Sequence, residues 1–370
     1  MKKILTYSFA CLSLLLWGSC SDKEAAPDVR GGDPIALSAA GTPVSAGTRA
    51  VSDFPNGGSI GVLASTYDET NTDEDGNIII NWQSYADIVN APAKATGFNE
   101  SDQSYSFGWG LNGNQPKYWP FDGSKLVFMA YGPHTDAYPW NLLLDMDSLK
   151  NLFVTLHENN YNTPDVMVAT NNGNRTPYNK DEITSTPTSY TSPPVDLGDF
   201  KHMMSQLTVE VRADGGMQGN IVITDLHVRT PRRSGSLSLV DSEWINQTDG
   251  SPFTYRLFPE TGTTETAFQS APVSKTVLLF PGSEDVTTIS ITLLDKGAST
   301  PTPYMREFMM PFFPNIDPAS TETMKLEQGM NTTLRLTVKN IGIPTPTTDI
   351  NLEGVLSDWN ERGKFGVTIN

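Results

Sequence analysis

Cysteine is nearly missing from this chain of 370 residues, which contains only Cys11 and Cys20. Because both lie close to the N-terminus, the rest of the chain has no disulfide and no thiol nucleophile. Basic residues are also few: 25 lysines and arginines stand against 42 aspartates and glutamates, for a formal net charge of −17. A chain with this charge is repelled by polyanions, which excludes nucleic acid as an expected partner.

Histidine is scarce as well, and the four that are present do not form a metal-binding pattern. They are His134, His157, His202 and His227. None of them forms a pair at the spacing of a zinc site, and the sequence has no nucleophile-elbow motif. We therefore predict no cofactor, no bound metal and no enzymatic activity. His202 leads into an apolar strand, so we expect it to be a partly buried structural residue.

Long apolar runs are missing except at the N-terminus. Two lysines there precede an apolar run from Ile4 to Trp17, which is shorter than the ~20 residues that span a membrane. This order of charged, apolar and small residues predicts a secretory signal over residues 1–19. Cys20 directly follows Gly18 and Ser19, as in a bacterial lipobox, and we predict that it is acylated after cleavage. A lipid on Cys20 would hold the exported protein at a membrane.

Residues 20–49 are mostly small and polar, which predicts a tether. One short stretch differs, because Ile35 and Leu37 alternate with small residues in a strand-like pattern.

Helical periodicity is weak, and alternation of apolar and polar residues dominates from residue 60 onward. Four segments alternate cleanly and predict half-buried strands, around residues 207–211, 289–293, 334–338 and 365–369. The denser runs 125–131 and 277–280 predict strands that are covered on both faces. The best helical pattern spans Asp145 to His157 and predicts a short surface helix. We infer an all-β fold of antiparallel sandwiches, with domains at 50–199 and 200–370 that are separated after the polar stretch 171–196.

Two motifs resemble ligand-binding loops but lack their context. Gly108 to Gly113 matches the dinucleotide pattern G-x-G-x-x-G, yet Pro116 follows where a helix is needed, so we predict a turn. Asp73 and Asp75 resemble the start of a calcium loop, but Trp82 replaces the bidentate acid that closes such a loop. We therefore interpret this acidic stretch as a solvated hairpin.

Aromatic residues gather in two places. One cluster contains Tyr118, Trp119, Phe121, Phe128 and Tyr131, and the other contains Trp359. Large aromatic side chains dominate the energetics of β-sandwich cores, so we expect these clusters to be buried. The alternative is that Trp109, Tyr118 and Trp119 form an exposed platform for a sugar.

Several segments, taken in order, resemble the fimbrillin family, which comprises subunits of type V pili and related bacterial surface lipoproteins. The resemblance runs from Thr48 to the C-terminus and is carried by the segments 48–50, 58–62, 117–123, 127–131, 200–209, 329–331 and 356–359. It implies two tandem transthyretin-like antiparallel β-sandwich domains and a lipidated precursor on the outer membrane surface or in a fimbrium. It also implies trimming by an arginine-specific protease between Arg49 and Ala50.

Such trimming suggests assembly by strand exchange with other pilus subunits. Removing an N-terminal strand exposes backbone groups and an apolar groove, which a strand from a neighbouring subunit fills. Ile35 and Leu37 are the candidates for the excised strand, and Phe365, Val367 and Ile369 are the candidates for the donor strand. Whether the chain polymerises, and whether it serves as stalk, tip or anchor, stays open at this point. The alternative function is an outer-membrane lipoprotein that binds a glycan or another host ligand.

Overall fold

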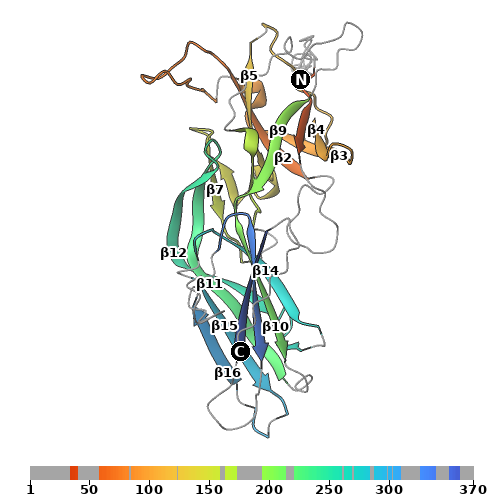
Figure 1. Ribbon diagram of the computed structural model, residues 1–370, viewed down its shortest axis with the longest axis vertical. Coiled ribbons are helices and arrows are strands. Elements are labelled where there is room, and N and C mark those ends of the chain that lie inside the picture. Colours follow the sequence, from red (N-terminus) through yellow and green to blue (C-terminus); the bar gives the residue numbers. More distant parts are fainter. Residues whose placement is uncertain are drawn as a thin grey trace, which may run out of the picture.

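The computed structural model describes residues 34–40, 58–82, 85–122, 124–158, 163–172, 194–213, 221–260, 262–268, 271–283, 287–297, 299–301, 303–309, 326–338 and 350–358. In this part of the chain the molecule is elongated, with a closed barrel at one end and two packed sheets at the other (Figure 1). Strands make up nearly all of its regular structure, which confirms the all-β prediction.

Seven strands form the barrel. In spatial order they are β1 (Leu37–Ala40), β4 (Ser104–Trp109), β3 (Ala91–Asn99), β2 (Ser59–Thr66), β5 (Leu126–Gly132), β8 (Met167–Ala169) and β9 (Val195–His202). Neighbouring strands are antiparallel except for β1 and β9, which are parallel. The sequence predicted a sandwich here, whereas the sheet closes on itself. It closes because β1 pairs with both β4 and β9, the two strands that would otherwise be edges.

Alanine supplies much of the barrel core. Among 21 buried core residues, seven are alanines, and they pack among larger side chains such as Phe107 and Trp119; the alanines are Ala39, Ala64, Ala91, Ala93, Ala95, Ala130 and Ala169. A barrel of seven strands has a narrow interior, so small residues are needed wherever opposite walls approach one another. This tight packing sets the size of side chain that each strand can present inward.

Strand β5 is buried on both faces, as its dense apolar sequence predicted. Leu126, Phe128 and Ala130 point into the barrel core. The alternate residues Val127, Met129 and Tyr131 belong to a second and larger core. That second core continues into the other lobe of the molecule, so β5 joins the two cores.

The other lobe packs two sheets around this larger core. One sheet has the order β14 (Val273–Leu279), β10 (Ser205–Ala213), β17 (Met330–Val338) and β18 (Ile350–Asp358). The other contains β11 (Ile221–Ser238), β12 (Glu243–Phe258), β13 (Thr266–Ala267), β15 (Thr288–Asp295) and β16 (Pro303–Met309). The inward residues of β10, β15 and β17 are fully buried, which confirms three of the four strands that alternation predicted. The fourth, around 365–369, lies outside the described residues.

The two lobes share a sheet. The hairpin of β6 (Leu142–Leu144) and β7 (Asn151–Thr155) lies in the sequence between the barrel strands β5 and β8. It pairs with the last five residues of β11, Ser234–Ser238, in the other lobe. Strand β9 also runs across position 200, close to the start of β10. The connection between the lobes is therefore a hydrogen-bonded sheet as well as the chain itself.

The helix predicted from Asp145 to His157 is wrong. Strand β7 occupies most of this segment, and Leu152, Val154 and Leu156 alternate inward with at most 1% of their surface exposed. Met146 and Phe153, which the helical pattern placed on a buried face, are 58% and 47% exposed. Alternation with a period of two, and not helical spacing, matches the observed burial, because the inward face of β7 packs on the shared core.

Three short 3-10 helices complete the described regular structure, at η1 (Ala86–Ile88), η2 (Thr135–Ala137) and η4 (Thr170–Asn172). Within the described ranges, no helix has the length and apolar character needed to cross a membrane.

Candidate functional site

Strand β1 lies in a groove of the barrel wall between β4 and β9. It runs antiparallel to β4 and parallel to β9, with Leu37 opposite Phe107 on one side and Val195 on the other. The Ile35 N–H donates to the Lys117 carbonyl at 2.8 Å, and the Val195 N–H donates to the Ala36 carbonyl at 2.8 Å. Both sides of β1 are thus tied into the sheet by backbone hydrogen bonds.

The side chains of this segment alternate between the barrel core and the outside. Ile35, Leu37 and Ala39 are 2%, 2% and 1% exposed, whereas Ala36 is exposed. The two residues predicted to form a strand in the tether, Ile35 and Leu37, therefore do sit in one extended segment with both side chains in the core. Burying an aliphatic side chain of this size contributes about 1.5–3 kcal/mol.

Trp109 at the end of β4 closes one end of the groove. Its indole N–H donates to the Ile35 carbonyl at 2.6 Å, and the side chain is 4% exposed. The turn that follows is the glycine motif: Gly110 and Gly113 have φ of +82° and +73°, and a Cβ on Gly108 would lie 2.3 Å from the Gly113 carbonyl oxygen. The motif is thus a tight turn, as the sequence context predicted, and this turn directly follows Trp109.

Without β1 the barrel would have two bare edges. The N–H and C=O groups of β4 and β9 that now pair with β1 would lose their partners, and the apolar core beneath Leu37 would be open to water. Unpaired edges above an apolar floor are what an added strand satisfies. Residues 41–57 connect the segment that fills the groove to the next strand of the barrel, β2.

Several predicted site residues lie outside the described part of the chain. They are Cys20, Arg49, Ala50, Phe365, Val367 and Ile369, together with Trp359. Acylation, trimming and strand donation at these positions stay predictions.

The aromatic residues are mostly buried. Trp109 and Trp119 are 4% and 2% exposed, and the Trp119 ring packs edge-on against Phe128 at 5.9 Å. Tyr118 is half-buried, whereas Phe121 is 70% exposed. The prediction of a buried cluster is confirmed for Trp119, Phe128 and Tyr131 and wrong for Phe121. A flat sugar-binding platform of Trp109, Tyr118 and Trp119 is not present.

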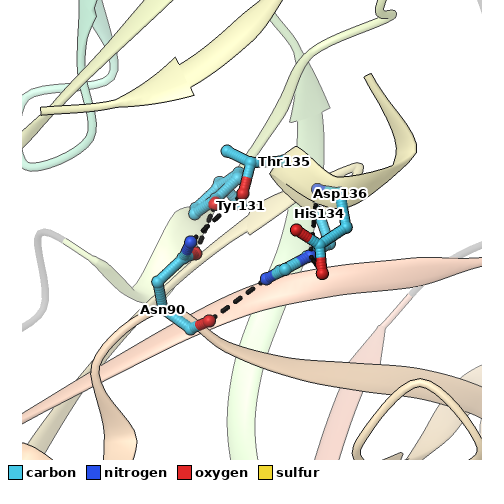
Figure 2. A network of polar contacts seen from close by, with 5 residues as sticks. All are labelled: Asn90, Tyr131, His134, Thr135 and Asp136. Carbon is cyan, nitrogen blue, oxygen red and sulfur yellow. Dashed lines mark hydrogen bonds and ion pairs between the residues drawn. The ribbon is translucent and has the colours of Figure 1, made fainter. Parts of the chain in front are cut away.

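A polar network around Tyr131 is the arrangement that most resembles a catalytic centre (Figure 2). The Tyr131 hydroxyl donates to the Asn90 side-chain oxygen at 2.5 Å, and the Asn90 amide donates to the Thr135 hydroxyl at 3.1 Å. His134 is 3% exposed; its Nε2 lies 3.1 Å from the Asn90 carbonyl, and its Nδ1 accepts from the Asp136 N–H at 3.2 Å.

These contacts give the network a structural role. Both ring nitrogens of His134 lie beside backbone groups, and Nδ1 is also 3.5 Å from an Asp136 carboxylate oxygen. Burial raises the pKa of the Tyr131 hydroxyl, so this group stays protonated. The network ties the end of β5 to Asn90, which directly precedes β3. Asn90 has a φ of +49°, an uncommon conformation for a residue other than glycine, and the network holds it in place.

The remaining polar candidates also serve local structure. The Asp73 carboxylate accepts from the backbone N–H groups of Asn77 at 2.8 Å and Asp75 at 3.0 Å, and the bond from Asn77 lowers its pKa. This makes a solvated hairpin, as predicted. His202 is buried rather than partly buried, with its Nδ1 2.9 Å from an Asp165 carboxylate oxygen. Among the described residues, no group of three or more His, Cys, Asp or Glu could hold a metal ion.

Comparison with known proteins gives consistent matches in sequence family and in fold. The family model described as fimbrillin-like matches residues 48–359. None of the curated proteins matches this chain. A candidate cell adhesion protein from Bacteroides ovatus is 16% identical, with a TM-score of 0.50 over 90% of this chain and 99% of that chain. One from Bacteroides uniformis is 16% identical, with a TM-score of 0.47 over 88% and 99%.

A further structure in the comparison is the fimbrial anchor protein Mfa2 from Porphyromonas gingivalis, which is 9% identical, with a TM-score of 0.36 over 91% of this chain and 99% of that chain. The family model spans most of the sequence, including the segments around residues 48–62, 117–131 and 200–209 that suggested the resemblance. Because this family model covers more than half of the chain, the chain belongs to the fimbrillin-like family.

Proposed function

We propose that this chain is a non-enzymatic pilus or surface adhesin subunit that assembles by exchanging the strand in the β1 groove. The observation that carries the proposal is that a segment preceding Arg49 fills a slot in the barrel wall, with Ile35 and Leu37 in the core. Arg49 lies nine residues after Ala40, the end of β1. Cutting there would leave β1 held only by non-covalent contacts.

The chemistry of the groove explains why a cut would lead to assembly. When β1 leaves, β4 and β9 need hydrogen-bond partners and the core needs apolar side chains. A strand from a neighbouring subunit supplies both. The alternating residues Phe365, Val367 and Ile369 are our candidates for that donor. We further propose that Cys20 is acylated, and that the precursor is displayed on the outer membrane before it joins a fimbrium.

The test is to treat purified full-length precursor with an arginine-specific protease. We expect an N-terminus at Ala50 and a ladder of detergent-resistant oligomers. The matched control is Arg49→Lys, which this protease does not cut and which should stay monomeric. Arg30→Lys serves as a second control. Arg30 precedes β1, so a cut at Arg30 leaves β1 covalently attached to the barrel, whereas a cut at Arg49 does not. Persistent monomer after clean cleavage at Arg49 would reject assembly by exchange.

Two variants separate the other parts of the proposal. Cys20→Ser should be exported without a lipid and released from the membrane fraction, while its barrel stays folded. Replacing Val367 and Ile369 with Ser should abolish the ladder without changing cleavage at Arg49. A ladder that persists in this double variant would exclude the C-terminal segment as the donor.

A further inference from the structure

The three inward positions of the groove differ in size. Ile35 and Leu37 present large aliphatic side chains to the core, whereas Ala39 presents a single methyl group. All three are at most 2% exposed, so the difference is not explained by one of them facing solvent.

The surroundings of Ala39 account for its small size. On one side it is opposite Tyr105, which is itself buried and packs on Phe98 with ring centroids 4.8 Å apart. On the other side the pairing with β9 shifts between Ser38 and Ala40, so that Leu197 and Gly198 together lie opposite Ala39.

This bulge in β9 is supported from behind. Gly198 has a φ of +75°, and a Cβ there would lie 2.3 Å from the Thr170 hydroxyl oxygen. Thr170 belongs to η4, and its hydroxyl accepts from the Asp199 N–H at 2.9 Å. The β9 wall is thus backed by η4 and cannot readily move outward to accept a larger residue at the Ala39 position.

We propose that the Ala39 position is the specificity determinant of the groove: the strand that occupies it must carry a large, a large and then a small side chain at alternate positions. For β1 itself this follows from the packing. Its extension to an incoming strand rests on the proposed function, since the same walls would receive that strand. The partner chemistry is thus an extended peptide with Ala, Gly or Ser two residues after its second large aliphatic residue.

A small third position also fixes the register. Sliding a strand by two residues keeps the same side chains facing inward, so hydrogen bonding alone does not prevent it. A slide in one direction would force Leu37 into the Ala39 position, and a slide in the other would leave Ala39 in the Leu37 position with a cavity. The Trp109 indole N–H can donate to the backbone carbonyl of whichever residue lies there, so it does not discriminate between these registers.

The rule makes a specific statement about donation by a second copy of this chain. If Phe365 took the Ile35 position, Ile369 would fall on the small position. The proposed rule therefore excludes a donor that enters with Phe365 at the Ile35 position.

The test measures hydrogen exchange of the β1 amides in the uncut full-length chain. Ala39→Leu should accelerate their exchange at least about tenfold, because the strand no longer fits. The matched control is Ala36→Leu, which adds the same atoms on the exposed face and should leave β1 exchange unchanged. Ala39→Ser should also behave like the parent chain.

Amides of β10 and β17 report whether the other lobe stays folded. If Ala39→Leu unfolds the whole chain, Ala39→Val is used in its place. Exchange of the β1 amides in Ala39→Val should be faster than in Ala39→Ser and slower than in Ala39→Leu. Equal protection of β1 in the Ser, Val and Leu variants overturns the proposal. This experiment uses the uncut chain, so its result does not depend on whether trimmed chains form oligomers. Oligomer formation after cleavage tests the proposed function separately.

Discussion

Truncating Leu37 to Ala tests how strongly β1 holds the barrel together. Leu37 is 2% exposed and lies between Phe107 and Val195, so the change removes buried methyl groups and leaves a cavity. Buried Leu→Ala substitutions cost about 2–5 kcal/mol, and a four-residue strand can relax partly into the space, so we expect about 2–3 kcal/mol. That corresponds to a fall of roughly 5–10 °C in Tm for a domain of ~150–250 residues.

The assay is thermal and denaturant unfolding of the full-length chain, followed by tryptophan fluorescence because Trp109 and Trp119 lie in the same core. Leu111→Ala is the matched control: the same atoms are removed from a side chain that is 49% exposed, and the expected cost is below about 1 kcal/mol. Equal destabilisation by the two variants would refute the view that β1 is an integral strand of the barrel.

Three more perturbations test the described contacts. Gly61→Ala places a Cβ 2.4 Å from the Tyr131 ring and should cost about 1–3 kcal/mol in denaturant unfolding, whereas Gly97→Ala, with nothing within 4 Å, should be neutral. Trp109→Phe removes the donor to the Ile35 carbonyl and should cost about 1–3 kcal/mol; an unchanged unfolding midpoint would contradict the hydrogen bond. Burial raises the pKa of Tyr131 in the folded state. The contribution of Tyr131 to the free energy of unfolding is therefore complete below its pKa of ~10 in the unfolded chain, and it is lost as the pH rises through its pKa in the folded chain. Unfolding at rising alkaline pH should therefore show a shallower loss of stability for Tyr131→Phe than for the parent chain.

Strand positions were predictable where one residue in two packs on a core. Strands β10, β15 and β17 follow that rule, and the dense sequence of β5 indicated burial on both faces. Strand β4 has the same alternation in Tyr105, Phe107 and Trp109, which are all buried. Its end overlaps a glycine-rich motif, which predicted only a turn. Trp109 as a groove residue was therefore missed, although its alternation with Ser106 and Gly108 would have revealed it.

Barrel closure was not predictable from local pattern. Strand β1 has only four residues, three of them with small side chains, and its partners Phe107 and Val195 lie far along the sequence. Such pairing depends on which edges remain open once the other strands have formed, and no short window of sequence contains that information. The β6–β7 hairpin was missed for a related reason, since its inward face is set by packing on β11 in the other lobe.

The pairing of β7 with the end of β11 has a mechanical consequence. A strand joined to a neighbour by a ladder resists being bent away from it, because several hydrogen bonds must break together. The five paired residues, Ser234–Ser238, and the core continuous beneath them oppose any swivel between the lobes. A pull applied at the barrel is passed to the far lobe along β11 as well as through the link from β9 to β10. Bending between the lobes would therefore have to break this ladder and open the core beneath it.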